Sequence, residues 1–103
     1  MTLEEINNRL LEIKEELVQA IRELKEVEYV FNKRYYYLLL HSPMGNIQAR
    51  EAEANLTCDS EGLWKPFLDK KTDVRTLSHE KEILLEVTKN IRLFYGERRL
   101  QTN

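Results

Sequence analysis

The chain has 103 residues, of which 42% are hydrophobic and 33% are charged, with only 3 glycines and 2 prolines. Its 16 basic and 18 acidic residues give a net charge of −2, which excludes a strongly basic, histone-like DNA binder. A chain of this length is typical of one domain at most. Many charges with few helix breakers favour long, solvated helices.

The sequence also bears on cellular location. No apolar run approaches the roughly 20 residues of a transmembrane helix, so we expect no membrane partner. Glu4 and Glu5 stand where a signal peptide would carry basic residues, which predicts a cytoplasmic protein. The single cysteine, Cys58, permits no internal disulfide and is compatible with a reducing compartment. A lone cysteine is more often an inert core residue than a reactive one, but the sequence does not show whether Cys58 is buried.

The first third of the chain has the heptad pattern of a coiled-coil helix. Its apolar residues recur in alternating steps of three and four, which places them in one seam. The seam residues are Leu3, Ile6, Leu10, Ile13, Leu17, Ala20, Leu24, Val27 and Phe31. Thr2 and Glu5 form a capping-box pattern, and Pro43 is the first helix breaker. The sequence therefore predicts a helix over about residues 3–40.

Two breaks divide the rest of the chain. Pro43 disfavours helical geometry at Ser42, so Ser42 is predicted to cap a second, short helix over about 43–58, with Pro43 at its first position. Gly62 marks a weaker break. A last helix is then predicted over about 64–96.

The two long segments differ in charge. Residues 1–32 carry eight acids and four bases, whereas residues 65–103 carry nine bases and six acids. Opposite charges favour pairing of the two segments, although exposed ion pairs add only about 0–1 kcal/mol each. An antiparallel arrangement would bring together charged residues near the two ends of the chain, namely Glu4, Glu5, Arg92, Arg98 and Arg99.

These elements predict an all-α fold, a long antiparallel helical hairpin similar to a coiled coil with a short middle helix, in a single domain of residues 1–103. A hairpin of this size buries little apolar surface. Six apolar residues lie outside the main seam: Leu11, Val18, Ile21, Leu39, Leu85 and Leu93. We expect a second copy to cover them, in a homodimer or larger homo-oligomer. The alternative is a monomer in which the middle helix covers this surface.

No residues have the spacing of a metal site or a catalytic site. His41, His79 and Cys58 are far apart in the sequence and belong to no ligand motif. No nucleophile lies in a recognisable pattern with a base. His41 is expected at the end of the first helix, where its charge suits the helix dipole. We therefore expect no enzyme activity and no cofactor.

Cationic and aromatic residues occur together on both sides of the predicted middle helix. Lysine and arginine can bind phosphates while aromatic rings stack on bases, as in single-strand nucleic-acid binders. The residues expected to carry such a site are Lys33, Arg34, Tyr36, Trp64, Lys70 and Lys71. Three consecutive tyrosines, at 35–37, point in three directions on a helix, so at least one hydroxyl should reach solvent or a partner. The alternative, which the negative net charge favours, is that the tyrosines fill a wider core with their hydroxyls at its rim.

The order of the sequence features is distinctive. A long heptad helix ends in tyrosines, and a Ser-x-x-Gly turn follows at Ser42 and Gly45. Further segments are Arg50-Glu51-Ala52-Glu53-Ala54, Leu68-Asp69-Lys70-Lys71 and Asn90-Ile91-Arg92. This order resembles a group of small, uncharacterised helical proteins of bacteriophages and prophages, often encoded among early replication and recombination genes. The resemblance implies a phage setting and a non-enzymatic role.

Two functions follow as expectations. The first is a phage accessory protein that acts by binding in DNA recombination or replication, through single-stranded nucleic acid or a replication protein. A protein partner would use the same tyrosine, tryptophan and arginine residues, which are common in interface hot spots. The alternative is an inhibitor, similar to an anti-CRISPR protein, whose acidic face blocks a host nuclease or defence enzyme.

Overall fold

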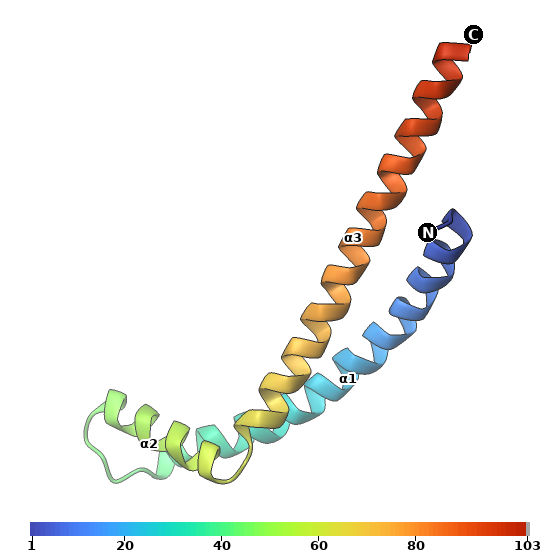
Figure 1. Cartoon of the computed structure of the whole chain (residues 1–103). Helices are drawn as coiled ribbons and strands as arrows, with labels where there is room; N and C mark the ends of the chain where they lie inside the picture. The colour runs from blue at the N-terminus through green and yellow to red at the C-terminus, as the bar shows by residue number, and fades with distance from the viewer. Residues whose placement is uncertain (103) are drawn as a thin grey trace. The chain divides into compact units, whose positions relative to one another are not determined.

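The computed structural model describes residues 1–102 of the chain, with side chains as far as Gly96. Three helices follow one another: α1 over Leu3–His41, α2 over Ile47–Ser60 and α3 over Trp64–Thr102 (Figure 1). The described residues form no β-strand, and the predicted all-α hairpin with a short middle helix is confirmed. Within this part of the chain, no helix combines the length and the hydropathy that crossing a membrane requires.

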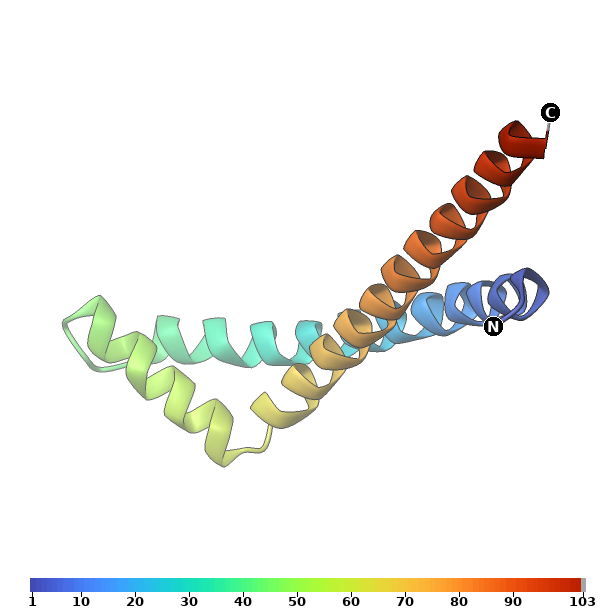
Figure 2. The same ribbon diagram turned by 45° about the horizontal axis from the view of Figure 1, so that its top comes forward.

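The contacts along the chain form two units, and both long helices contribute to each. Unit 1 comprises Met1–Val18 and Arg75–Asn103, so it pairs the start of α1 with the later part of α3. Unit 2 comprises Gln19–Val74, which is the rest of α1, all of α2 and the start of α3. The same segments can be followed from a second direction in Figure 2.

The start of α1 is fixed by the predicted capping box. The Glu5 amide donates to the Thr2 hydroxyl over 3.2 Å, and the Thr2 amide donates to the Glu5 carboxylate over 3.4 Å. These bonds satisfy amides that have no partner inside the helix. At its other end α1 finishes at His41, one residue beyond the predicted limit, with the imidazole in the last turn.

The start of α2 differs from the prediction. Asn46 is the N-cap, and its side chain accepts a 2.7 Å hydrogen bond from the Gln48 amide. The predicted cap, Ser42, instead accepts from the Met44 amide over 3.2 Å and donates to Glu53 over 3.0 Å. Because the Ser42 hydroxyl is used inside the connecting turn, the helix begins after residue 46 and not at residue 43.

Gly62 ends α2, as the sequence predicts. Its φ of +74° lies in the left-handed region that favours glycine. The Leu63 amide donates to the Cys58 carbonyl and the Gly62 amide to the Asp59 carbonyl, each over 3.0 Å. These bonds satisfy carbonyls that the end of the helix leaves without partners.

The last helix is longer than predicted. It begins at Trp64, as expected, and it accommodates Pro66 in its first turn, where the missing amide costs little. It continues to Thr102 instead of ending near residue 96. Gly96 does not end it, because this glycine lacks the positive φ that Gly62 adopts.

The core of unit 1 is the predicted heptad seam. Ile6 and Ile13 have no exposed surface and pack with Leu84 of α3, which is 7% exposed. The half-buried residues around them are Leu10, Leu17, Leu77, Val87 and Ile91. Thr88 is buried beside this seam, and its hydroxyl donates to the Leu84 carbonyl over 2.9 Å. The buried hydroxyl of Thr88 therefore has a hydrogen-bond partner within its own helix.

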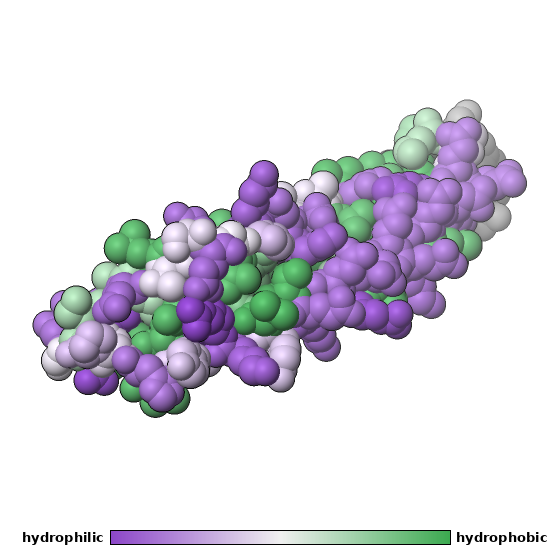
Figure 3. Space-filling view, turned by 90° about the horizontal axis from the view of Figure 1, so that it is seen from below, coloured by the Kyte–Doolittle hydropathy of each residue, from purple (hydrophilic) through white to green (hydrophobic). Residues whose placement is uncertain are grey.

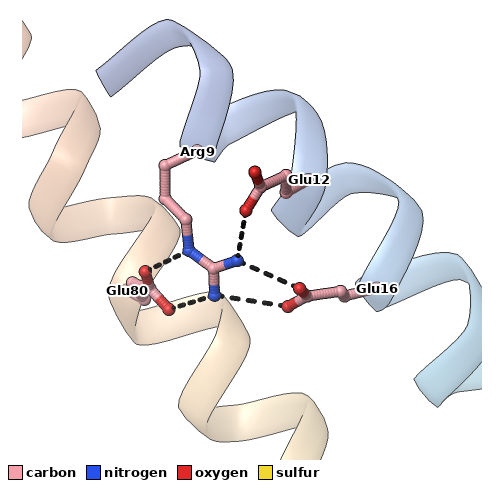
Figure 4. Close-up of polar contacts among 4 residues, drawn as sticks. All are labelled: Arg9, Glu12, Glu16 and Glu80. Carbon is pink, nitrogen blue, oxygen red and sulfur yellow. Dashed lines mark hydrogen bonds and ion pairs between the residues drawn. The ribbon is translucent and has the colours of Figure 1, made fainter. Parts of the chain in front are cut away.

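An arginine network borders this core and joins α1 to α3 (Figure 4). Arg9 donates to both carboxylate oxygens of Glu80, over 2.6 and 2.8 Å. Its guanidinium also contacts Glu12 at 3.1 Å and Glu16 at 3.0 Å. The hydrogen bonds that Arg9 donates to these carboxylates, that to Glu80 first, raise the pKa of Arg9, and the same bond to Glu80 lowers the pKa of Glu80.

The expected charge pairing at the end of the hairpin is not seen in the described side chains. Glu5 is hydrogen-bonded to Thr2 at the start of α1. The exposed Arg92 forms no ion pair with Glu4 or Glu5. Arg98 and Arg99 lie outside the described side chains. Among the described side chains of unit 1, Arg9 and Glu80 form an ion pair between α1 and α3.

Candidate functional site

Unit 2 contains an aromatic core, and this core includes Trp64. Phe31 is only 6% exposed, and its ring centroid lies 4.5 Å from that of Trp64 and 5.1 Å from that of Phe67. Tyr35 stacks on Phe31 at 5.8 Å, and burial raises the pKa of Tyr35. Tyr35 and Trp64 therefore both pack in the aromatic core of unit 2.

The middle helix contributes small residues to unit 2. Ala54 and Cys58 of α2 have no exposed surface. Burial raises the pKa of the Cys58 thiol, which disfavours the reactive thiolate. The structure therefore places Cys58 in the core of unit 2.

Three of the predicted cations make contacts within unit 2. Arg34 binds the Glu61 carboxylate through two nitrogens, over 2.9 and 2.6 Å, and this lowers the pKa of Glu61. The Lys70 ammonium lies 2.6 Å from a Glu23 carboxylate oxygen. Lys71 lies over an aromatic ring of the core, 5.0 Å from its centroid. Arg34 and Lys70 are thus already neutralised by carboxylates, which leaves them poorly suited to phosphate.

The three consecutive tyrosines point in three directions, as predicted. Tyr35 enters the core, whereas Tyr36 and Tyr37 are 58% and 53% exposed. Tyr37 lies against its own helix neighbours, with the Arg34 guanidinium 5.5 Å and the His41 ring 4.3 Å from its ring centroid. Tyr36 presents most of its ring to solvent from the outer side of α1.

Lys33 and Tyr36 lie together on the outer side of α1, beside residues that were not among the predicted site residues. A shallow groove of about 430 Å³ joins them. Its lining residues, which we call the tyrosine–lysine face, are Lys25, Glu28, Tyr29, Asn32, Lys33 and Tyr36. The structure therefore brings together two of the six predicted residues and places the other four in or beside the aromatic core and its ion pairs.

Helical spacing explains the composition of this face. Tyr29 and Tyr36 are seven residues apart, so they lie on one side of α1 about 10 Å apart along its axis. Lys25 precedes Tyr29 by four residues and Lys33 follows it by four. Tyr29 is 66% exposed. These spacings of four and seven residues are the sequence signal that could have identified Lys25 and Tyr29 as members of the face.

Both lysines of the tyrosine–lysine face are available to a ligand. Among the described side chains, no carboxylate lies within ion-pair distance of Lys25 or Lys33. The carboxylate of Glu28 is also exposed, and no described group donates a hydrogen bond to it. The face therefore combines two unpaired cations, one unpaired anion and two open aromatic rings.

Comparison with known proteins assigns no family to this chain. No family model matches it, and neither a curated protein nor a solved structure does. The described part of the chain is an all-α helical hairpin with a shallow, open groove on its first helix.

Proposed function

We propose that this protein is a non-enzymatic accessory protein of a bacteriophage that binds single-stranded nucleic acid during DNA recombination or replication in the host cytoplasm. The observation that carries the proposal is the tyrosine–lysine face, with its two unpaired lysines and two exposed tyrosines. The phage setting is supported by the resemblance of the sequence alone.

The chemistry of the face fits an unpaired strand. Lysine ammonium groups bind phosphates without regard to sequence, and tyrosine rings stack on any base. Each stacked base contributes about 1–3 kcal/mol. Tyr29 and Tyr36 are separated by about 10 Å along the helix axis, which is roughly the rise of three stacked nucleotides at about 3.4 Å each. A short segment of strand can therefore contact both rings and both lysines.

We expect the double substitution Lys25→Glu/Lys33→Glu to weaken binding to a fluorescein-labelled oligothymidylate. Loss of two phosphate contacts should reduce the slope of log affinity against log salt by about 1.4, since each contact on a single strand contributes about 0.7. The measurement is fluorescence anisotropy across a series of salt concentrations. Arg34 is left intact, because its charge is held by Glu61.

The matched control is Lys14→Glu/Lys89→Glu, which makes the same charge change at two exposed lysines outside the face. We expect this control to keep most of the affinity and the original salt slope. Equal losses in the two double variants would mean that only total charge matters, and would contradict a site on α1. If the wild-type chain binds no oligonucleotide at low salt, nucleic-acid binding is wrong and inhibition of a host enzyme becomes the function to test.

We also propose that the chain self-associates. Of the six apolar residues outside the main seam, Leu39 is half-buried and five are exposed: Leu11, Val18, Ile21, Leu85 and Leu93. Figure 3 shows hydrophobic surface open to solvent between hydrophilic side chains. Leu11 and Val18 are 63% and 54% exposed and lie seven residues apart on one side of α1. Exposed apolar surface of this kind favours an interface.

We expect Leu11→Glu/Val18→Glu to lower the mass measured by light scattering behind size exclusion toward that of a monomer, because burial of two carboxylates opposes association. Ile47→Glu/Leu56→Glu is the control, since both side chains are about 70% exposed on α2 (69% and 72%). A measured mass of a monomer for the wild-type chain would refute self-association. An equal decrease in mass for the control would mean that the interface lies on α2 and not on this side of α1.

A further inference from the structure

Glu28 is an unexpected residue in a face that binds phosphates. It lies in the same groove as Lys25 and Lys33, and its carboxylate would repel a phosphate group. No described cation neutralises it, although Lys25 is only one helical turn away. An unpaired carboxylate at this position is consistent with a ligand that supplies hydrogen-bond donors.

The groove also contains an amide next to this carboxylate. Asn32 follows Glu28 by four residues, so the two side chains are neighbours along α1, and both line the groove that Tyr29 and Tyr36 also line. A carboxylate only accepts hydrogen bonds, and it can accept two parallel ones. The Asn32 amide can donate as well as accept. No described group bonds to either side chain, so both are available to a ligand.

Among the bases, guanine matches this pair of side chains best. Its Watson–Crick edge carries two adjacent donors, N1–H and the N2 amino group, beside the O6 acceptor. Thymine has a single N3–H between two carbonyl oxygens, which would repel a carboxylate. Cytosine and adenine have an amino group next to a ring nitrogen that accepts and does not donate. Only guanine can donate two parallel hydrogen bonds to one carboxylate.

We propose that the groove binds a guanine base of single-stranded DNA. The Glu28 carboxylate accepts from N1–H and N2–H, the Asn32 amide donates to O6, and Tyr29 or Tyr36 stacks on the ring. This inference rests on the proposed nucleic-acid binding and adds a base preference to it. Lys25 and Lys33 then bind the flanking phosphates, which compensates for the charge of Glu28.

The test compares three labelled oligothymidylates in fluorescence anisotropy, with a central thymine, guanine or hypoxanthine, the last of which lacks the N2 amino group. We expect the wild-type chain to bind the guanine strand about tenfold more tightly than the thymine strand. The hypoxanthine strand should fall between them, because it retains only N1–H. Glu28→Gln should reduce the guanine-to-thymine affinity ratio to about one, because the amide that replaces the carboxylate cannot accept two parallel hydrogen bonds from N1–H and N2–H.

Glu26→Gln is the matched control, because Glu26 is exposed on the same helix but does not line the groove. It should keep the guanine preference. Equal affinities of the wild-type chain for the guanine and thymine strands would overturn this inference and leave the proposed function intact. A guanine preference that survives Glu28→Gln would also overturn it. Absence of binding to all three strands would overturn both.

Discussion

Replacing Phe31 by alanine is expected to cost the most stability of any single truncation in unit 2. Phe31 is 6% exposed and contacts the rings of Trp64, Phe67 and Tyr35. Removal of a buried phenylalanine side chain lowers the free energy of unfolding by about 3–5 kcal/mol. For a chain of this size, that loss is a large part of the total stability.

The measurement is urea unfolding at one fixed protein concentration, followed by the fluorescence of Trp64, which is the only tryptophan. Phe31→Leu keeps part of the side-chain volume and should lose less, which provides a readable result if the alanine variant does not fold. The control is Tyr37→Ala, since this ring is 53% exposed. Similar losses for Phe31→Ala and Tyr37→Ala would contradict an aromatic core centred on Phe31.

The second large effect is expected at Ile13 in unit 1. Its side chain has no exposed surface and packs in the seam with Ile6 and Leu84. Ile13→Ala should lower the free energy of unfolding by about 2–5 kcal/mol, from lost burial and from the cavity left behind. Ile83→Ala removes the same atoms from a side chain that is 61% exposed, so it is the matched control.

Both isoleucine variants can be compared by thermal unfolding followed by circular dichroism at the helix signal. We expect a clearly lower midpoint for Ile13→Ala and a midpoint close to wild type for Ile83→Ala. An equal decrease in the two variants would show that the seam does not hold unit 1 together. The heptad pattern would then have predicted a helix without predicting its packing.

The heptad seam could be predicted from the sequence because it depends on spacing within one helix. Ile6, Ile13, Ala20 and Phe31 are all buried, as their membership of the predicted heptad seam implies. The exception is Leu3, which is 37% exposed at the start of the helix. The end of α2 could also be predicted, because the left-handed backbone conformation that follows a helix strongly favours glycine, and Gly62 adopts it.

The start of α2 shows where local signals compete. Ser42 and Asn46 are both good N-cap residues, and the sequence does not show which of them begins the helix. In the structure the Ser42 hydroxyl donates a hydrogen bond to Glu53 of α2, and Asn46 caps the helix. A contact between residues eleven positions apart is outside the reach of capping rules.

The candidate site was predicted only in part, because residues adjacent in sequence are not adjacent on a helix. The run Lys33-Arg34-Tyr35-Tyr36 divides between the core and the outer side of α1, whereas Lys25 and Tyr29 join that outer side from earlier turns. The loss of Arg34 from the site has a different cause. Its partner Glu61 lies 27 residues away in the sequence, and only the fold brings the two together.

Photochemical cross-linking can show whether nucleic acid binds on the tyrosine–lysine face of α1. An oligothymidylate in which one thymine is replaced by 5-iodouracil reacts on irradiation with an aromatic ring stacked against it, and mass spectrometry of the digested complex locates the modified residue. We expect adducts on Tyr29 or Tyr36, and their loss in Lys25→Glu/Lys33→Glu. Adducts confined to Trp64 or Tyr95, or no adduct from a strand that binds, would rule out binding on this face.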